Sequence, residues 1–369
     1  MRNRVVVLAP LLALAACGSS GGGVAESAGT IAPPISTVTP PSSPTSTKAN
    51  MLDASATTTF DAVGALQSLS VDDKGAELYR GDASTVDAPS GTISYNPRDG
   101  IFTLALSDAA AGVTRNITFQ DPAHRATADS ARNGEYEVPL LAGFNYLQAL
   151  DGDANLTFFY KRPTNGSFVS LGGFERATLD TKTGAYEAEQ GVFVFGDRTP
   201  GLAMPLTGAG HFDGEFLATM VGQEGNTAGV LQWISGTSAV DADFAKRTLS
   251  LSVDGTVGPG YVKDTQIADA NLAIAPGTAF SAQGSASWTS TSTAFSGKFS
   301  SAGFVTSTNQ AIPVDFTPVS AGTTTAGASS IDGTFYGPAT QNVGGNFRIV
   351  GGVPNERFDI LGAFTAAKK

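Results

Sequence analysis

The chain has 369 residues, of which 15% are charged, and a formal net charge of −11. Because the phosphates of nucleic acid repel a polyanion, nucleic-acid binding is not expected. The length exceeds a typical domain of roughly 100–200 residues and predicts two folded units plus unstructured segments. The 44 glycines and 22 phenylalanines favour β structure, since aromatic residues fit a pleated, half-buried sheet.

Residues 1–16 have the pattern of an export signal. Arg2 and Arg4 precede an apolar stretch that is about ten residues long, against roughly 20 for a membrane-spanning helix. The residues that follow, Leu-Ala-Ala-Cys17, resemble the bacterial lipobox, which implies cleavage before Cys17 and attachment of lipid to its thiol. Gly18 next to the cysteine implies, for that class, the outer membrane. An ordinary secretory signal with a chance cysteine is the alternative.

Residues 17–50 are expected to form the lipidated cysteine and a disordered tether. The segment opens with glycines and serines and continues with five prolines among serines and threonines. Such a composition buries too little apolar surface to offset the entropy of ordering the chain. Cys17 is the only cysteine, so no disulfide can form within the chain.

Residues 51–204 predict a β-rich first unit. Apolar runs at 101–104, 158–160 and 191–195 alternate with turn signals such as Asn96-Pro97 and Asp99-Gly100. Residues 61–69 and 139–150 are each compatible with a short helical turn. We therefore expect a predominantly β domain with irregular connections.

Residues 205–369 show the clearest strand pattern. Phe280, Ala282, Ala286 and Trp288 share one face of a predicted strand whose other face carries serines and Gln283. Similar alternation recurs around residues 249–253, 295–299 and 347–349, with tight turns between the runs. The pattern predicts an antiparallel barrel or sandwich, and small residues beside large aromatic ones fit the taper of a closed barrel.

Three stretches in order carry a family resemblance: residues 191–216, the pair Asp243-Phe244, and a final motif. The final motif comprises Phe335, Tyr336, Gly337, Pro338, Gly344 and Gly345. Behind a lipobox and a tether, these stretches resemble the surface lipoproteins related to transferrin-binding protein B. The resemblance implies an all-β fold, with an N-terminal β-rich handle domain followed by a C-terminal eight-stranded antiparallel β-barrel. Phe-Tyr-Gly-Pro occurs once, which implies one lobe where the transferrin receptor has two and puts transferrin in doubt as the ligand.

The residues of the final motif are expected to serve folding. Gly337 and Gly345 allow backbone angles that other residues avoid, and Pro338 cannot donate to a sheet ladder. By alternation Phe335 and Phe347 face the barrel core. The motif is therefore interpreted as structural.

The residues for catalysis and metal binding are scarce, with only two histidines in the chain. Alternation places His211, Asp213 and Glu215 on an outer, wet face, and no metal site is expected there. The sequence has none of the common hydrolase, metalloprotease or phosphate-loop motifs. We therefore predict a binding protein that is not an enzyme and needs no cofactor. His124, in a loop, is a candidate axial haem ligand, because some secreted relatives of the resembled family bind haem.

Ligand binding is expected to use exposed aromatic residues on a rigid scaffold. The candidates are Tyr79, Tyr95, Tyr136, Phe144 and Tyr146, with sheet packing as the alternative for each. The predicted function is capture of a protein or nutrient ligand, such as an iron or haem source, by a lipoprotein on the cell surface that acts as co-receptor of an outer-membrane transporter. The alternatives are a haem-binding lobe, a structural or adhesive coat lipoprotein, and attachment to the periplasmic face of the outer membrane.

Overall fold

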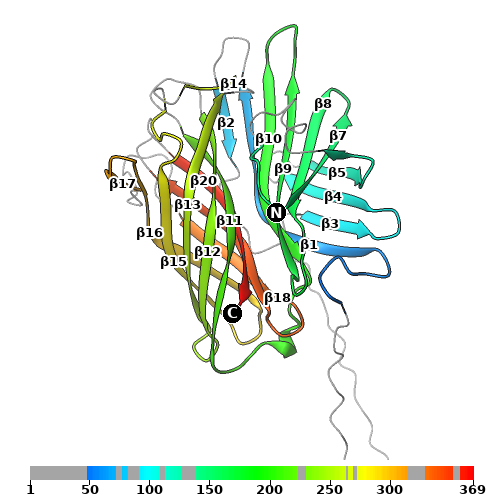
Figure 1. Cartoon of the computed structure of the whole chain (residues 1–369), viewed down its shortest axis with the longest axis vertical. Helices are drawn as coiled ribbons and strands as arrows, with labels where there is room; N and C mark the ends of the chain where they lie inside the picture. Colours follow the sequence, from blue (N-terminus) through cyan, green and yellow to red (C-terminus); the bar gives the residue numbers. More distant parts are fainter. Residues whose placement is uncertain are drawn as a thin grey trace, which may run out of the picture. The chain divides into compact units, whose positions relative to one another are not determined.

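The computed structural model describes residues 48–71, 77–81, 91–108, 113–126, 138–222, 230–262, 265–268, 272–314, 329–351 and 358–369. The predicted signal peptide, Cys17 and most of the predicted tether lie outside these residues. The described residues form two antiparallel β sheets and one short 3₁₀ helix, all in the compact unit of residues 45–369 (Figure 1). No helix within them is long and apolar enough to cross a membrane.

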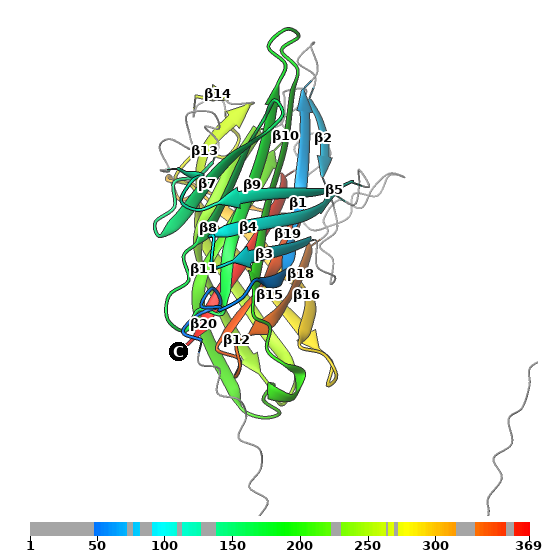
Figure 2. The ribbon, with the colours of Figure 1, turned by 90° about the vertical axis from the view of Figure 1, so that its right-hand side faces the viewer.

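The first sheet, which we call the handle, comes from the N-terminal half of the unit. Its strands pair in the order β5-β4-β3-β1-β10-β9-β8-β7-β6, with β2 beside β1. Figure 2 shows β3, β4 and β5 running across the long strands β1 and β10. The strands are β1 (Thr58–Val71), β2 (Glu77–Gly81), β3 (Gly91–Asn96), β4 (Ile101–Asp108), β5 (Val113–Gln120), β6 (Arg125–Ala126), β7 (Phe144–Asp151), β8 (Ala154–Lys161), β9 (Val169–Leu179) and β10 (Tyr186–Gly196).

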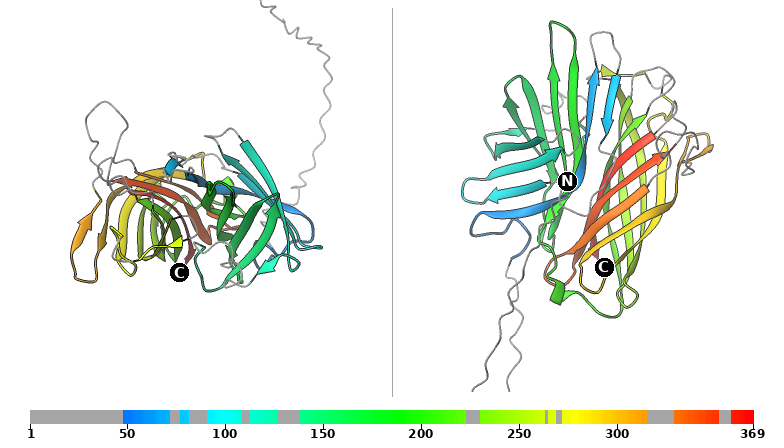
Figure 3. Two further views of the ribbon diagram at one scale, coloured as in Figure 1. Left: turned by 90° about the horizontal axis from the view of Figure 1, so that it is seen from above. Right: turned by 180° about the vertical axis from the view of Figure 1, so that it is seen from behind.

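The second sheet closes into an antiparallel barrel of eight strands, as expected. It runs β12-β11-β20-β19-β18-β16-β15-β13, and an additional β12–β13 pairing joins its ends (Figure 3). The strands are β11 (Ala209–Gly222), β12 (Val230–Asp243), β13 (Thr248–Val262), β15 (Ala279–Trp288), β16 (Ala294–Val305), β18 (Ser329–Tyr336), β19 (Asn342–Gly351) and β20 (Phe358–Lys368). Two short strands, β14 (Thr265–Gln266) and β17 (Ala311–Pro313), pair with β13 and β16.

The barrel core is filled by the apolar residues that alternate with polar ones along the strands, as predicted. Phe280, Ala282, Ala286 and Trp288 are buried in one hydrophobic cluster, whereas the serines between them are exposed. Phe335 lies at the centre of this cluster. Its ring centroid is 5.3 Å from that of Trp288, 5.6 Å from that of Phe244, 5.8 Å from that of Phe295 and 6.2 Å from that of Phe212. Phe347 is also fully buried there.

The handle packs against the barrel with one face of its long strands. In β10, Val192 and Val194 join a cluster with Trp233 and Ala363 of the barrel, whereas Phe193 and Phe195 point into the handle's own core. An ion pair also crosses from sheet to sheet, because Lys161 Nζ donates to Glu215 Oε1 over 2.8 Å. The handle and barrel are therefore joined by a packed interface.

The Phe-Tyr-Gly-Pro motif forms the joint of this interface. Tyr336, beside the inward-facing Phe335, points out of the barrel into the interface cluster and is completely buried. The N–H of Gly337 donates to the carbonyl of Asp197 over 2.8 Å, directly after β10. Gly337 has a φ of 82°, which favours glycine, and β18 ends at Tyr336, before Pro338. The motif therefore has a structural role, as expected: it binds the handle to the barrel.

Two expectations were wrong. Residues 61–69 lie in β1, and 139–150 form turns and most of β7, so neither segment contains a helical turn; the only described helix is the 3₁₀ helix η1 (Gly201–Ala203). Gly345 does not adopt a positive φ. It lies inside β19, where a Cβ atom would come within 2.1 Å of the carbonyl oxygen of Asp332, so close backbone approach explains the glycine.

Candidate ligand-binding end

The unit has two ends, defined by strand direction. At the first, which we call the distal end, lie the β7–β8 and β9–β10 turns of the handle and the 222/230 ends of β11 and β12 (Figure 1). A cluster of Ala177, Tyr186 and Ala188 with Val221 and Leu231 holds the two sheets together there. At the opposite end, which we call the tether end, the described chain begins: Lys48 Nζ lies 3.3 Å from Asp197 Oδ2, and Gly166 donates to the carbonyl of Ala49.

The β9–β10 turn at the distal end is held by its own hydrogen bonds. Asp180 Oδ1 accepts from the N–H of Lys182 over 2.8 Å, and Oδ2 accepts from the hydroxyl of Thr183 over 2.8 Å. These bonds, led by that of Lys182, lower the pKa of the Asp180 carboxyl. The loop closes because Gly184 has a φ of 72°, so the tip has a defined shape.

Exposed apolar side chains accompany this tip. Leu179, the last residue of β9, is 49% exposed, and Leu150, near the end of β7, is 75% exposed. The turn after Leu150 carries Asp151 and Asp153, both exposed. On the barrel, Val305 at the corresponding end of β16 is 39% exposed. Apolar anchors surrounded by polar groups on a rigid scaffold are the usual composition of a protein-binding surface.

Three of the five aromatic candidates, Tyr95, Phe144 and Tyr146, are described with their side chains, and none of these three lies in the turns of the distal end. Tyr79 lies in β2, but its side chain, like the whole of Tyr136, is outside the described residues. Tyr95 is half-buried with its ring centroid 4.6 Å from that of Phe102, and burial raises the pKa of its hydroxyl. Phe144 lies beneath Lys161 Nζ at 5.6 Å from the ring centroid.

Tyr146 serves packing. It is 4% exposed, stacks on Phe159, and donates its hydroxyl hydrogen to the carbonyl of Pro139 over 2.7 Å. Sequence reasoning missed Leu150 and Leu179 because a leucine at a strand end resembles any core leucine. The only signal was the Asp180-to-Gly184 turn that follows Leu179.

The candidate haem ligand His124 lies in the turn between β5 and β6. Its Nδ1 accepts a hydrogen bond from the N–H of Gln120 over 3.0 Å, so the neutral ring carries its proton on Nε2. An axial histidine normally binds iron through one nitrogen and donates from the other, which this bond opposes. Around the turn, Arg125 pairs with Asp121 and donates to Asn145 Oδ1 over 2.7 Å, so the neighbourhood is polar.

His211 lies on the outer face, as expected. Its ring bridges two carboxylates, with Nδ1 2.7 Å from Asp241 Oδ1 and Nε2 2.9 Å from Asp213 Oδ1. The bond to Asp241 is the main cause of a raised pKa for the imidazole. The open depression here measures about 330 Å³. Among the described residues no three metal-binding side chains gather around one point.

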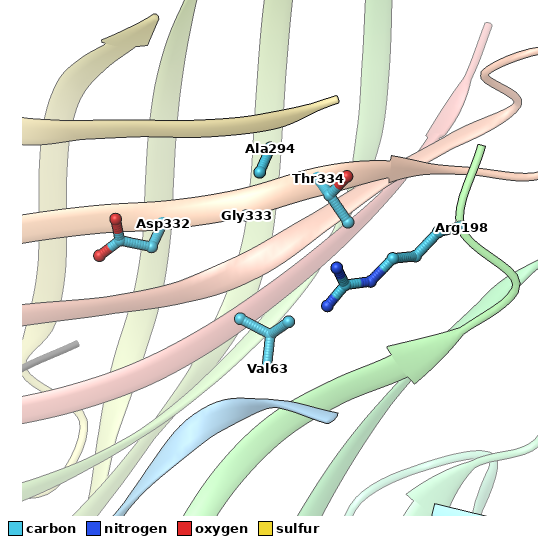
Figure 4. A pocket seen from close by; sticks show the side chains of 6 residues that line it. All are labelled: Val63, Arg198, Ala294, Asp332, Gly333 and Thr334. Atoms are coloured by element: carbon cyan, nitrogen blue, oxygen red, sulfur yellow. The ribbon is translucent and has the colours of Figure 1, made fainter. Parts of the chain in front are cut away.

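A small cavity lies at the handle–barrel interface (Figure 4). Val63 and Arg198 line it from the handle side, and Ala294, Asp332, Gly333 and Thr334 from the barrel. Its volume is about 10 Å³, close to the least space that holds one water molecule. The cavity is therefore too small for a nutrient ligand.

The fold and the exposed end define an all-β lobe in which a handle is fixed to a closed barrel. Residues 204–368 match the family described as the C-lobe and N-lobe beta barrels of Tf-binding protein B, and this part of the chain belongs to that family of barrels. The family expected from the motifs is thus confirmed.

The solved structures that match the chain are distant in sequence. Intact Ap-TbpB, with its N and C lobes, is 12% identical, with 85% of this chain and 77% of that chain covered and a TM-score of 0.36. A variant of transferrin-binding protein B from Haemophilus parasuis Hp5 is 13% identical over 78% of this chain and 56% of that chain, with a TM-score of 0.35. The isotype 1 transferrin-binding protein B from serogroup B Neisseria meningitidis is 11% identical, with 87% of this chain and 78% of that chain covered and a TM-score of 0.25. At these TM-scores the likenesses add nothing to the family match of the barrel. No curated protein matches the chain.

Proposed function

We propose that this chain is a lipid-anchored outer-membrane protein that captures a protein ligand at the cell surface, in the service of iron acquisition. The observation that carries the proposal is the position of Leu150 and Leu179. Both are exposed beside tight turns at the end of the unit opposite the entry of the chain at Lys48. A lipid on Cys17 would leave this distal end farthest from the membrane and open to a soluble partner.

The family match of the barrel supports a binding role. Proteins of the matched family are named for binding transferrin, and iron-carrying proteins are therefore the first class of ligand to test. Burying a leucine side chain yields about 1.5–3 kcal/mol. Burial of both leucines would therefore supply a large share of the binding free energy of about 8 kcal/mol that a micromolar complex requires. The acidic residues of the turns, Asp151, Asp153 and Asp180, favour a partner with a basic surface.

No observation favours the haem-binding alternative, given the hydrogen bond to His124 Nδ1. A coat protein without a ligand would leave the distal leucines without a role. The proposal therefore treats the chain as a binding protein that lacks enzymatic activity.

The test is capture of ligand by the immobilised full chain from host serum and from culture fluid. We expect Leu150→Asp/Leu179→Asp to reduce the captured partner at least about tenfold, because each exchange puts a charge in place of an apolar anchor. Leu140→Asp, which alters a leucine that is 57% exposed and precedes the tether-end start of β7, is the control. Equal capture by all three proteins, or capture lost only in the control, would contradict the proposal.

A further inference from the structure

The connection between handle and barrel, residues 197–208, is pinned at both ends. The N–H of Thr199 donates to the carbonyl of Phe335 over 2.9 Å, and its hydroxyl donates to the carbonyl of Gly337 over 2.8 Å. Met204 packs against the barrel core. Between these anchors η1 (Gly201–Ala203) is closed by the bond from Ala203 N–H to the carbonyl of Pro200. The segment therefore has a fixed shape.

This pinned segment holds two leucines away from the protein. Leu202 is 105% exposed and Leu206 is 78% exposed, the two highest values among the large apolar side chains described. Pro200, two residues before Leu202, and Pro205, directly before Leu206, each fix one backbone φ angle in this segment. Single exposed leucines are common, but two on one rigid loop indicate a partner.

The position of the segment identifies the kind of partner. It lies at the tether end, where η1 is at the lower edge of the molecule in Figure 1. Asp197 at its start binds Lys48, the first described residue of the chain that leads from Cys17. The leucines are thus on the side of the unit at which a lipid anchor would enter.

Basic and acidic residues are mixed at this end. Arg162, Lys246, Arg247, Lys368 and Lys369 lie in its terminal turns and chain end, and Asp197, Asp213, Asp241 and Asp243 lie near them. Lys246 pairs with Asp243 and Lys369 with Asp213. Arg162, Arg247 and Lys368 make no ion pair within the described parts of the chain. Basic groups around apolar side chains are typical of surfaces that contact anionic lipid headgroups.

We propose that the tether end is a membrane-docking face, on which Leu202 and Leu206 insert into the lipid bilayer and the surrounding basic residues contact phosphate headgroups. The inference rests on the lipid anchor of the proposed function. The anchor supplies a high local concentration, so two leucines suffice to orient a module that they could not recruit alone. Docking through this face points the distal end away from the membrane.

The test uses an environment-sensitive fluorophore on the exposed Thr207→Cys in the full chain. The lipidated protein is reconstituted on vesicles of phosphatidylethanolamine, phosphatidylglycerol and lipopolysaccharide, the phosphate-bearing lipid of the outer leaflet. We expect a blue shift of the emission relative to the protein in solution, and loss of that shift in Thr207→Cys/Leu202→Ser/Leu206→Ser. The same fluorophore on Gln266→Cys, at the distal end, is expected to show no shift in either background.

Four outcomes decide the matter. A blue shift that depends on the two leucines supports docking. One fluorophore per chain with no shift overturns it and leaves the proposed function intact. Two fluorophores per chain mean that the Cys17 thiol is free, which overturns the anchor and the docking together. A shift seen only with native outer-membrane fragments overturns docking on lipid and assigns the face to a membrane protein.

Discussion

The hydroxyl of Thr199 donates a hydrogen bond of 2.8 Å to the carbonyl oxygen of Gly337, and both groups are buried where the handle meets the barrel. This bond joins the end of the handle to the motif that marks the barrel family. Beside it the N–H of Gly337 donates to the carbonyl of Asp197. This joint adds to the packed clusters and the Lys161–Glu215 ion pair that hold the handle on the barrel.

Replacing Thr199 with valine tests the joint. The exchange preserves shape but leaves the carbonyl of Gly337 without its donor in a buried site, so we expect a loss of about 1–3 kcal/mol in the free energy of unfolding. Urea denaturation of the full chain measures it. The exposed Thr237→Val is the control, and equal midpoints for the two variants would contradict the role of the bond.

Gly345 tests the close approach of β18 and β19. A Cβ atom there would lie 2.1 Å from the carbonyl oxygen of Asp332 and 2.7 Å from the Cα of Gly333, and both are backbone atoms that cannot turn aside. We expect Gly345→Ala to lower the free energy of unfolding by at least about 1–3 kcal/mol. Thermal unfolding of the full chain measures the loss. In the same experiment Gly201→Ala is expected to be neutral, because nothing lies within 4 Å of the new Cβ atom. A neutral Gly345→Ala would mean that the two strands can move apart.

Neighbouring residues of the motif should respond differently to truncation. Phe335→Ala removes the ring at the centre of the barrel core and should cost about 3–5 kcal/mol of stability. Tyr336→Phe removes a hydroxyl that is buried without a hydrogen-bond partner in the described structure, so stability should stay the same or rise. Burial also raises the pKa of that hydroxyl. A loss of more than about 1 kcal/mol in Tyr336→Phe, by denaturant titration, would reveal a partner for the hydroxyl.

The sequence predicted the barrel better than the interface. Alternation is visible in strands with one wet face, such as β15, where Phe280 is buried and Ser281 is exposed. In β19 both faces are buried, because the handle covers the outward side. Asn346 and Arg348 therefore resemble solvent-facing residues in the sequence yet lie inside, with Arg348 paired to Asp359.

The candidate site was predicted less well than the fold. The distal end is assembled by strand direction: Leu150 and Leu179 precede different turns that only the β7-β8-β9 pairing brings to one end. No local pattern encodes that proximity. The three chosen aromatic residues whose side chains are described, Tyr95, Phe144 and Tyr146, pack within the handle, because aromatic side chains fill β-sheet cores as readily as they anchor partners.

His211 provides a test of the outer barrel face. Hydrogen bonds to Asp241 and Asp213 raise the pKa of the imidazole above its ordinary value of 6.5. Because the folded-state pKa is raised, the pairing contributes its full stabilisation below about pH 6.5 and loses it as the pH rises through the folded pKa. The contribution is small since the ring is exposed. NMR titration should show a raised pKa that falls towards the ordinary value in Asp241→Asn, and an unchanged titration in that variant would contradict the assigned cause.

The central claim is that the chain stands on the cell surface with its distal end outward. Cysteine labelling on intact cells tests it directly, because the sole native cysteine, Cys17, is expected to be acylated. A membrane-impermeant maleimide should label Leu179→Cys on intact cells and leave the unsubstituted protein unlabelled. Labelling of Leu179→Cys only after the outer membrane is broken would place the distal end in the periplasm and contradict the account.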